Sequence, residues 1–205
     1  MAALLKFGES EHLALLRDEG LLYMNPLPFF WKCEGKDALR GDHFDSVDAI
    51  RRGTKFAIGK SPDQMQAMTG NFEFRIHPPD SQKINLFCMF AFVPNKTPLP
   101  IDERNFEFGT HALVVKDVDE FVKRMMTTID REGILFERGL VEYVNDDHSG
   151  EVGPFKKLRK FEFQSEWRLV CYEGPGDVRQ IRIGSIADIS ELVPCEELRG
   201  QGGSA

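Results

Sequence analysis

The pattern of hydrophobic and polar residues predicts one buried central strand with shorter strands around it. Residues 84–93, INLFCMFAFV, are almost uninterruptedly apolar, which is typical of a strand covered on both faces. Residues 71–77 alternate, with Phe72, Phe74 and Ile76 on one side, and this predicts a half-buried strand. Further apolar or alternating runs predict strands at 3–7, 21–24, 56–59, 111–116, 135–144 (with a bulge at Gly139) and 179–184.

Helical signals are fewer. Residues 117–132 carry an apolar stripe of helical period, with Asp117 as the cap and Glu120 completing a capping box. A second helix is predicted from a Ser10 cap to Glu19, ended by Gly20. A short helix is expected at 46–52, and a loop or single helical turn at 60–70.

Strands therefore outnumber helices without a regular strand–helix alternation. This favours an α+β fold with a mixed, mainly antiparallel sheet and few helices. No repeat or linker divides the chain, so residues 1–199 are expected to form a single domain, followed by a disordered tail at 200–205.

Charge and cysteine usage narrow the function classes. The net charge of −7 argues against a general nucleic-acid binder, which needs a basic face. The cysteines, at 33, 88, 171 and 195, form no C-x-x-C pair, and no ligand spacing indicates a metal site. No secretory segment or long apolar run is present, so we expect a cytoplasmic protein with free thiols and no membrane partner.

The most informative segment is 161–170, FEFQSEWRLV, which is predicted to be a strand. Because alternate residues share a face, Gln164, Glu166 and Arg168 point one way while Trp167 and Leu169 point into the core. Two interpretations remain open for this polar row. It is either a catalytic constellation or a solvated row of cross-strand charges.

A Gln-x-Glu motif on a strand is one way in which ADP-ribosyltransferases carry their catalytic carboxylate. The opening LLKFGESEHLALLRDEGLLYMNPLPFF, read as strand, helix, Gly-Leu and second strand, resembles the start of that fold. It is similar in particular to RNA 2′-phosphotransferases and to toxins that modify DNA bases. Most of the chain also resembles small bacterial and phage proteins that have an Asn-Pro opening and a late E-x-R strand preceded by Lys.

The resemblance implies an enzyme that uses NAD as a substrate. Glu166 would stabilise an oxocarbenium-like transition state and Gln164 would position the acceptor. Lys6 or Phe7 would stand where the family presents His or Arg to the NAD ribose, a departure from its pattern, and Tyr23 would lie near the nicotinamide. Other candidates for stacking on the nicotinamide or binding the pyrophosphate are Phe29, Phe30, Arg40, Lys157 and Arg159.

The resemblance leaves the acceptor open between nucleic acid and protein. The basic run 156–160 favours nucleic acid, with Lys157 and Arg159 as phosphate contacts, although such a run is also typical of a solvated face. A toxin or phage-defence role, with an antitoxin or regulatory partner, fits such a protein. The alternative is a non-catalytic binding or regulatory module of the same fold, which Lys6 in place of His or Arg favours.

Overall fold

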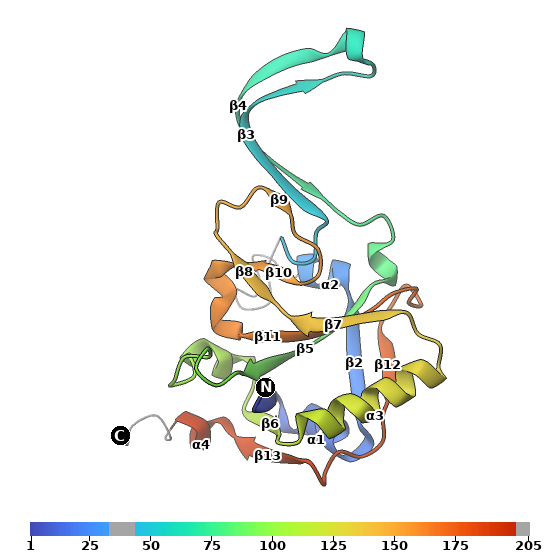
Figure 1. The fold of residues 1–205 in the computed structure, drawn as a ribbon, viewed down its shortest axis with the longest axis vertical. Coiled ribbons are helices and arrows are strands. Elements are labelled where there is room, and N and C mark those ends of the chain that lie inside the picture. Colours follow the sequence, from blue (N-terminus) through green and yellow to red (C-terminus); the bar gives the residue numbers. More distant parts are fainter. Residues whose placement is uncertain (33–43, 200–205) are drawn as a thin grey trace.

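A computed structural model describes residues 1–32 and 44–199 of the 205-residue chain (Figure 1). The helices are α1 (Ser10–Glu19), α2 (Leu27–Lys32), α3 (Val118–Arg131) and α4 (Cys195–Arg199). Short 3₁₀ segments are η1 (Pro62–Gln64), η2 (Ser81–Lys83), η3 (Glu103–Phe108) and η4 (Arg159–Gln164). The strands are β1 (Ala3–Gly8), β2 (Leu21–Pro26), β3 (Ala49–Ile58), β4 (Gln66–Ile76), β5 (Asn85–Phe92), β6 (His111–Val115), β7 (Phe136–Leu140), β8 (Glu142–Val144), β9 (Gly150–Glu151), β10 (Lys156–Leu158), β11 (Glu166–Cys171), β12 (Arg179–Arg182) and β13 (Ser190–Pro194).

The predicted α+β class and mainly antiparallel sheet are confirmed. β5, the apolar run at 84–93, is central as predicted, and six of its eight residues are buried. It pairs with β1, β2 and β11, and β6, β7, β12 and β13 extend the sheet from these strands. Among the described strands, β8 and β10 form the one parallel pair. The other pairings are antiparallel, and several join strands far apart in the sequence, such as β1 with β5 and β2 with β12.

The main core lies where α1 and α3 bury their apolar residues against the sheet. Phe121, Met125 and Ile129 of α3 are fully buried, and the Phe121 ring lies edge-on to Trp167 of β11, with centroids 6.5 Å apart. As predicted, the Asp117 side chain caps α3 by accepting from the Glu120 N–H at 3.0 Å. These contacts fix the strand that carries Glu166 against the core.

The connections of α1 are partly as predicted. Gly20 ends the helix in the left-handed conformation, with φ of 64°. The N-cap is Glu9 rather than Ser10, and its side chain makes no capping hydrogen bond.

The expected bulge at Gly139 is wrong, because Gly139 stays in register opposite Arg168 and the strand is interrupted at Val141 instead. β13 and α4 were not predicted, and the expected tail at 200–205 lies outside the described residues.

A two-stranded arm made of β3 and β4 projects from the body (Figure 1). The helix expected at 46–52 is wrong, since residues from Ala49 onward belong to β3. Of the loop or helical turn expected at 60–70, residues 62–64 form the single turn η1, but residues 66–70 belong to β4. The half-buried strand expected at 71–77 is also corrected, because Phe74 is 47% and Ile76 45% exposed. The alternation in this segment separates the two faces of a two-stranded ribbon that lies outside the core.

None of the helices in the described parts of the chain is long and apolar enough to cross a membrane.

Candidate functional site

A cleft opens where two strands leave β5 in different directions. β11 pairs with residues 85–90 along one edge of β5, so β1 and β2 share the opposite edge. β1 pairs there with Phe90 to Phe92, and β2 only with Asn85 and Leu86. The stretch of β5 between these pairings has neither strand beside it. The sheet therefore splits, with β1 and β6 on one side of the gap and β2 and β12 on the other.

The gap is a cavity of about 820 Å³, within the range of small-molecule sites. β1 and α1 form one wall, β2 forms the other, and Phe87 to Phe90 of β5 form the floor. Most of the lining is apolar or aromatic. The polar and charged groups that line it are Lys6, Glu9, His12, Tyr23, Asn25, Asp45, Asn105, Glu107, Lys157, Gln164 and Glu166.

Lys6 spans the split. Its ammonium donates a 2.6 Å hydrogen bond to the carbonyl oxygen of Cys88, on the uncovered stretch of β5. The same ammonium lies 5.0 Å from the centroid of the Phe87 ring, a cation–π distance. A lysine at this position places a positive charge on the floor of the cleft. It also satisfies a strand carbonyl that no neighbouring strand reaches.

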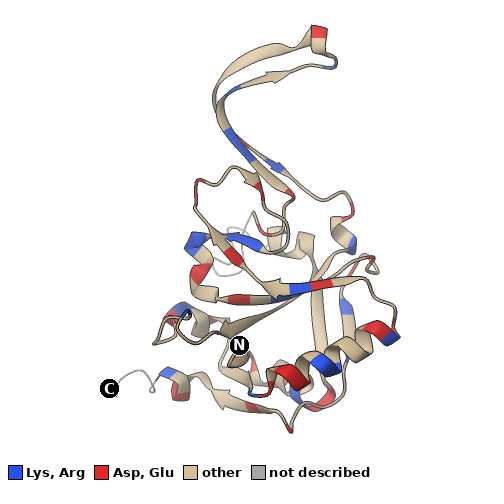
Figure 2. Cartoon of the chain, in the orientation of Figure 1, with Lys and Arg blue, Asp and Glu red and all other residues tan. Residues whose placement is uncertain are grey.

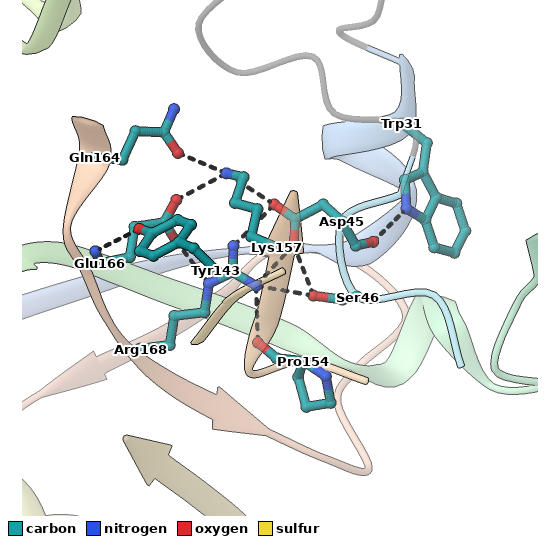
Figure 3. A network of polar contacts seen from close by, with 9 residues as sticks. All are labelled: Trp31, Asp45, Ser46, Tyr143, Pro154, Lys157, Gln164, Glu166 and Arg168. Atoms are coloured by element: carbon teal, nitrogen blue, oxygen red, sulfur yellow. Dashed lines mark hydrogen bonds and ion pairs between the residues drawn. The ribbon is translucent and has the colours of Figure 1, made fainter. Parts of the chain in front are cut away.

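Four buried charges meet at the inner end of the cleft (Figure 3). The Lys157 ammonium donates to Glu166 Oε1 at 2.8 Å and lies 3.4 Å from Asp45 Oδ2. Arg168 Nε donates to Glu166 Oε2 at 2.6 Å. Its Nη1 and Nη2 donate to Asp45 Oδ1 and Oδ2 at 2.7 and 3.0 Å. Two anions and two cations balance, so the buried charge quartet of Asp45, Lys157, Glu166 and Arg168 is neutral overall.

Neutral groups complete the hydrogen bonding of the charge quartet. Arg168 Nη1 also donates to the Pro154 carbonyl oxygen at 2.8 Å, and Lys157 donates to Gln164 Oε1 at 2.6 Å. The backbone N–H of Glu166 donates to the Tyr143 hydroxyl at 2.9 Å. Such saturation offsets the cost of burying four ions, because an unpaired buried charge is far more expensive than a paired one.

The charge quartet holds its carboxylates ionised. Burial alone would raise the pKa of Glu166, but Arg168 and Lys157 outweigh it and hold that pKa well below its usual range. The same two cations outweigh burial at Asp45 and lower its pKa. Burial acts against the Arg168 guanidinium, yet Asp45 and Glu166 raise its pKa well above the usual value. Glu166 is therefore a carboxylate, not a carboxylic acid, at neutral pH.

The two residues proposed as catalytic both line the cleft. The expected strand at 161–170 is corrected, because Gln164 belongs to η4 and the strand begins at Glu166. Glu166 and Arg168 share a face as predicted, while Trp167 and Leu169 enter the core. The alternative of a solvated charge row is wrong, since Glu166 is 8% and Arg168 0% exposed. β11 lies between β5 and β7, so neither of its edges is open, and all six of its residues are buried.

The residues expected to bind NAD are only partly brought together. Tyr23 lies on β2, half-exposed, across the gap from Lys6 and Phe7 of β1. The Phe7 ring packs edge-on against Phe90, at 6.0 Å between centroids. Phe30 of α2 also lines the cleft. Arg40, the expected pyrophosphate ligand, lies outside the described residues.

The two predicted phosphate contacts, Lys157 and Arg159, lie in different environments. Lys157 is 4% exposed with its ammonium inside the charge quartet, so the expectation that it faces outward in a basic run is wrong. Its neighbours in β10 and η4 explain this, because Leu158 and Phe161 bury the same segment in a second apolar cluster. Arg159 does face solvent, with a loose 4.0 Å pairing to Glu162.

Asp45 and Tyr143 are site residues that sequence reasoning did not place. One signal was available: two adjacent same-face charges within an apolar strand require buried partners. The sequence does not say which carboxylate, 123 residues away, supplies one.

No group of three or more His, Cys, Asp or Glu side chains within 1–32 and 44–199 is arranged to hold a metal ion. Comparison with protein-family models, with curated proteins and with solved structures gives no match to this chain.

Proposed function

We propose that the cleft binds NAD and that the protein transfers ADP-ribose from it to a macromolecular acceptor. The observation that carries the proposal is the position of Glu166, an ionised carboxylate at the inner end of a cleft that also contains Lys6 and Tyr23. The resemblance of the opening segment to ADP-ribosyltransferases supplies the identity of the substrate. The acceptor is a nucleic acid or a protein.

Transfer of ADP-ribose from NAD requires a fixed negative charge beside the ribose. The bond between the ribose C1′ and the positively charged nicotinamide nitrogen breaks, and nicotinamide leaves as a neutral molecule with the bonding electrons. Positive charge then develops on the ribose, and a nearby carboxylate stabilises it. An acceptor nucleophile forms the new bond to C1′ and releases its proton. Glu166 would supply the stabilising charge, with its orientation held by Lys157 and Arg168.

The other walls of the cleft suit the rest of the substrate. Tyr23 and Phe7, on opposite walls, offer faces on which an aromatic ring can stack. Lys6 offers a cation to the ribose or pyrophosphate oxygens. Gln164, which is held by Lys157, lies close enough to Glu166 to position an acceptor group.

A second function, ligand binding without catalysis, is favoured by one specific observation. Each carboxylate oxygen of Glu166 already has a cationic partner, Oε1 with Lys157 and Oε2 with Arg168. A carboxylate neutralised in this way can have a purely structural role, in which it holds Lys157 and Arg168 in place. The two functions differ in whether the glycosidic bond of NAD is broken.

The deciding experiment measures nicotinamide release from NAD, with cell lysate as the acceptor source, for the wild type and Glu166→Gln. The amide keeps the shape of the side chain and removes its charge. Glu162→Gln is the matched control, because Glu162 lies four residues earlier with a side chain that is 61% exposed. We expect release from the wild type and the control and its loss in Glu166→Gln.

Calorimetry with NAD separates the outcomes. A Glu166→Gln variant that still binds NAD but releases no nicotinamide would assign the charge to catalysis. Binding without release in the wild type would support the binding module. Neither binding nor release by a folded wild-type protein would overturn both functions for this ligand.

A further inference from the structure

The arm formed by β3 and β4 has two chemically different faces. Cross-strand partners in an antiparallel ribbon point to the same side, so the register assigns each residue to a face. One face, here called the aromatic face, carries Phe56, Ile58, Met68, Phe72, Phe74 and Ile76. The opposite face carries Ile50, Arg52, Lys55, Ala57, Ala67, Thr69, Glu73 and Arg75.

The polar face is anchored to the described part of the body at the base of the arm. Arg52 and Arg75 both lie over the Phe44 ring, each with its guanidinium carbon 5.1 Å from the ring centroid. Arg52 also pairs with Glu73 at 2.7 Å and donates to backbone oxygens of the 146–148 loop. Ile50, on this face, is fully buried. The base is thus fixed in orientation, and the aromatic face is turned away from the body.

The aromatic face is assembled but uncovered. The rings of Phe56, Phe72 and Phe74 contact one another, with centroid distances of 5.1 to 5.6 Å. Even so, Ile58 is 59%, Met68 46%, Phe74 47% and Ile76 45% exposed, and Met65 at the tip is 52% exposed. Side chains of this size exposed by about half add up to on the order of 450 Å², as large as the main apolar patch of a typical monomer.

The ribbon also lacks the support that a free hairpin needs. Beyond its short pairing with β9 at Ala49 and Ile50, the arm has no third strand in the described structure. An isolated two-stranded hairpin is only marginally stable in water, and a covering layer on its apolar face is the usual remedy. The arm projects away from the body, and no segment of residues 1–32 or 44–199 covers its aromatic face, which leaves another molecule as the source of that layer (Figure 1).

We propose that the aromatic face packs against the same face of a second copy of this chain, forming a twofold-symmetric dimer through the arms. An isologous contact needs a self-complementary surface, and a row of Phe, Met and Ile side chains on one face of the ribbon can pack against the same row of a second copy. The exposed apolar side chains supply over half of the roughly 800 Å² per partner of a standard interface, before backbone and flanking atoms are added.

Most charged side chains of the arm lie off the aromatic face, so an apolar contact through that face would not bury them. Residues 49–76 hold five Lys or Arg and two Asp or Glu, a net charge of +3, while the whole chain is at −7 (Figure 2). The cations Arg52, Lys55 and Arg75 lie on the polar face and would point away from the partner. Arg51, opposite Phe74, is the one cation that the register places on the aromatic face. Two acidic bodies meanwhile stay apart, because they meet only through their arms.

Sedimentation equilibrium from about 1 to about 200 µM tests the proposal, since only self-association depends on protein concentration in this way. We expect the wild type to be dimeric at the upper concentrations. The double variant Met68→Asp, Phe74→Asp should raise the dimer dissociation constant at least about 100-fold, because symmetry buries four carboxylates. Both side chains are half-exposed in the single chain, so the fold, checked by circular dichroism, should survive.

The matched control is Thr69→Asp, which adds a charge to the same ribbon on its polar face, opposite Lys55. It should leave the dissociation constant unchanged. A Met68→Cys variant should form an interchain disulfide through the new thiol under mild oxidation, and Thr69→Cys should not. A monomeric wild type would overturn the proposal and leave the face to a different polypeptide. Dimers that persist in the double variant, or that crosslink equally at 68 and 69, would overturn it too.

Discussion

Arg168 and Asp45 are joined by two hydrogen bonds across 123 residues of sequence. The pair ties the segment that follows α2 to the central sheet, and Lys157 and Glu166 complete the group on the cleft side. The same four side chains therefore hold the fold together and set the electrostatics of the proposed active site. Because of this dual role, a substitution in the charge quartet is expected to change both stability and activity, and each effect needs its own variant and measurement.

Loss of one charge from the quartet should be costly. Asp45→Asn leaves two buried cations facing one anion, so the free energy of unfolding should fall by about 3–5 kcal/mol. Urea denaturation measures this loss. The control is Glu162→Gln, whose exposed partner Arg159 is 4.0 Å away, and it should change stability by no more than about 0.5 kcal/mol. Equal effects of the two substitutions would show that the buried pairing has no special energetic role.

Stability should depend on pH through the same carboxylates. The pKa values of Glu166 and Asp45 are lowered in the folded protein, so their contribution is fully present above the unfolded-state pKa values of about 4.3 and 3.9. It should be lost as the pH falls below about 4, because protonation favours the unfolded chain. Urea denaturation at successive pH values tests this. Asp45→Asn should lose stability less steeply over that range, and an equally steep fall would contradict the assignment.

Elements with a clear local pattern of apolar residues were predicted from the sequence. The apolar run at 84–93 was identified as central, and α3 was predicted from its stripe and from Asp117, because such patterns depend only on local period. The arm was missed for the opposite reason. Its alternation at Phe72 and Phe74 implies a buried face, and sequence carries no sign that the face lies outside the body.

The candidate site was predicted in identity but not in environment. Glu166 and Arg168 were recognised as a same-face pair, yet the segments that pack over that face, which carry Asp45, Pro154 and Lys157, decide whether the pair is solvated. Lys157 looked like part of a surface run because its neighbours in sequence are basic. Its inward orientation depends on the apolar contacts of Leu158 and Phe161 and on carboxylates supplied from elsewhere in the chain. Long-range partners of this kind leave no local signal.

Lys6 should contribute to NAD binding through its charge at the split. Lys6→Met should weaken NAD binding by about 10- to 100-fold, the cost of losing one charge-assisted hydrogen bond. Lys6→Arg keeps a cation at this position, of the type that the resembled family uses there, and should retain most of the wild-type affinity. Calorimetric titration with NAD measures both. Wild-type affinity in Lys6→Met would remove Lys6 from the binding site.

Cys88, in the floor of the cleft, should be an unreactive thiol. Burial, with a contribution from Glu166, raises its pKa to about 12. Since a free cysteine has a pKa of about 8.5, the thiolate fraction at pH 8 should be lower by about a thousandfold, and alkylation correspondingly slower. Mass spectrometry of the iodoacetamide-treated protein gives the rate at this site, with the urea-unfolded protein as the control. Rapid modification of the folded protein would contradict the raised pKa.

Gly20, which lies directly before the β2 wall of the cleft, should be highly sensitive to substitution. Gly20 ends α1 with φ of 64° and leads into β2, and a Cβ there would collide with the carbonyl oxygen of Gly184. Gly133 has nearly the same φ, 63°, but open space around it. Gly133→Ala should therefore cost only the left-handed penalty of about 1 kcal/mol, measured by urea unfolding.

Gly20→Ala should cost about 3 kcal/mol or more, because the clash adds to that penalty and the Gly184 backbone cannot yield as a flexible side chain would. Relief of the clash would move the corner away from residues 183–184 and strain the hydrogen bond from the Ile183 N–H to the Gly20 carbonyl oxygen, 3.1 Å long. β2 would shift with it and change the width of the gap to β1. NAD affinity should then fall in Gly20→Ala and stay unchanged in Gly133→Ala. Equal losses of stability in the two variants would show that the close packing at Gly20 does not set the geometry of the cleft.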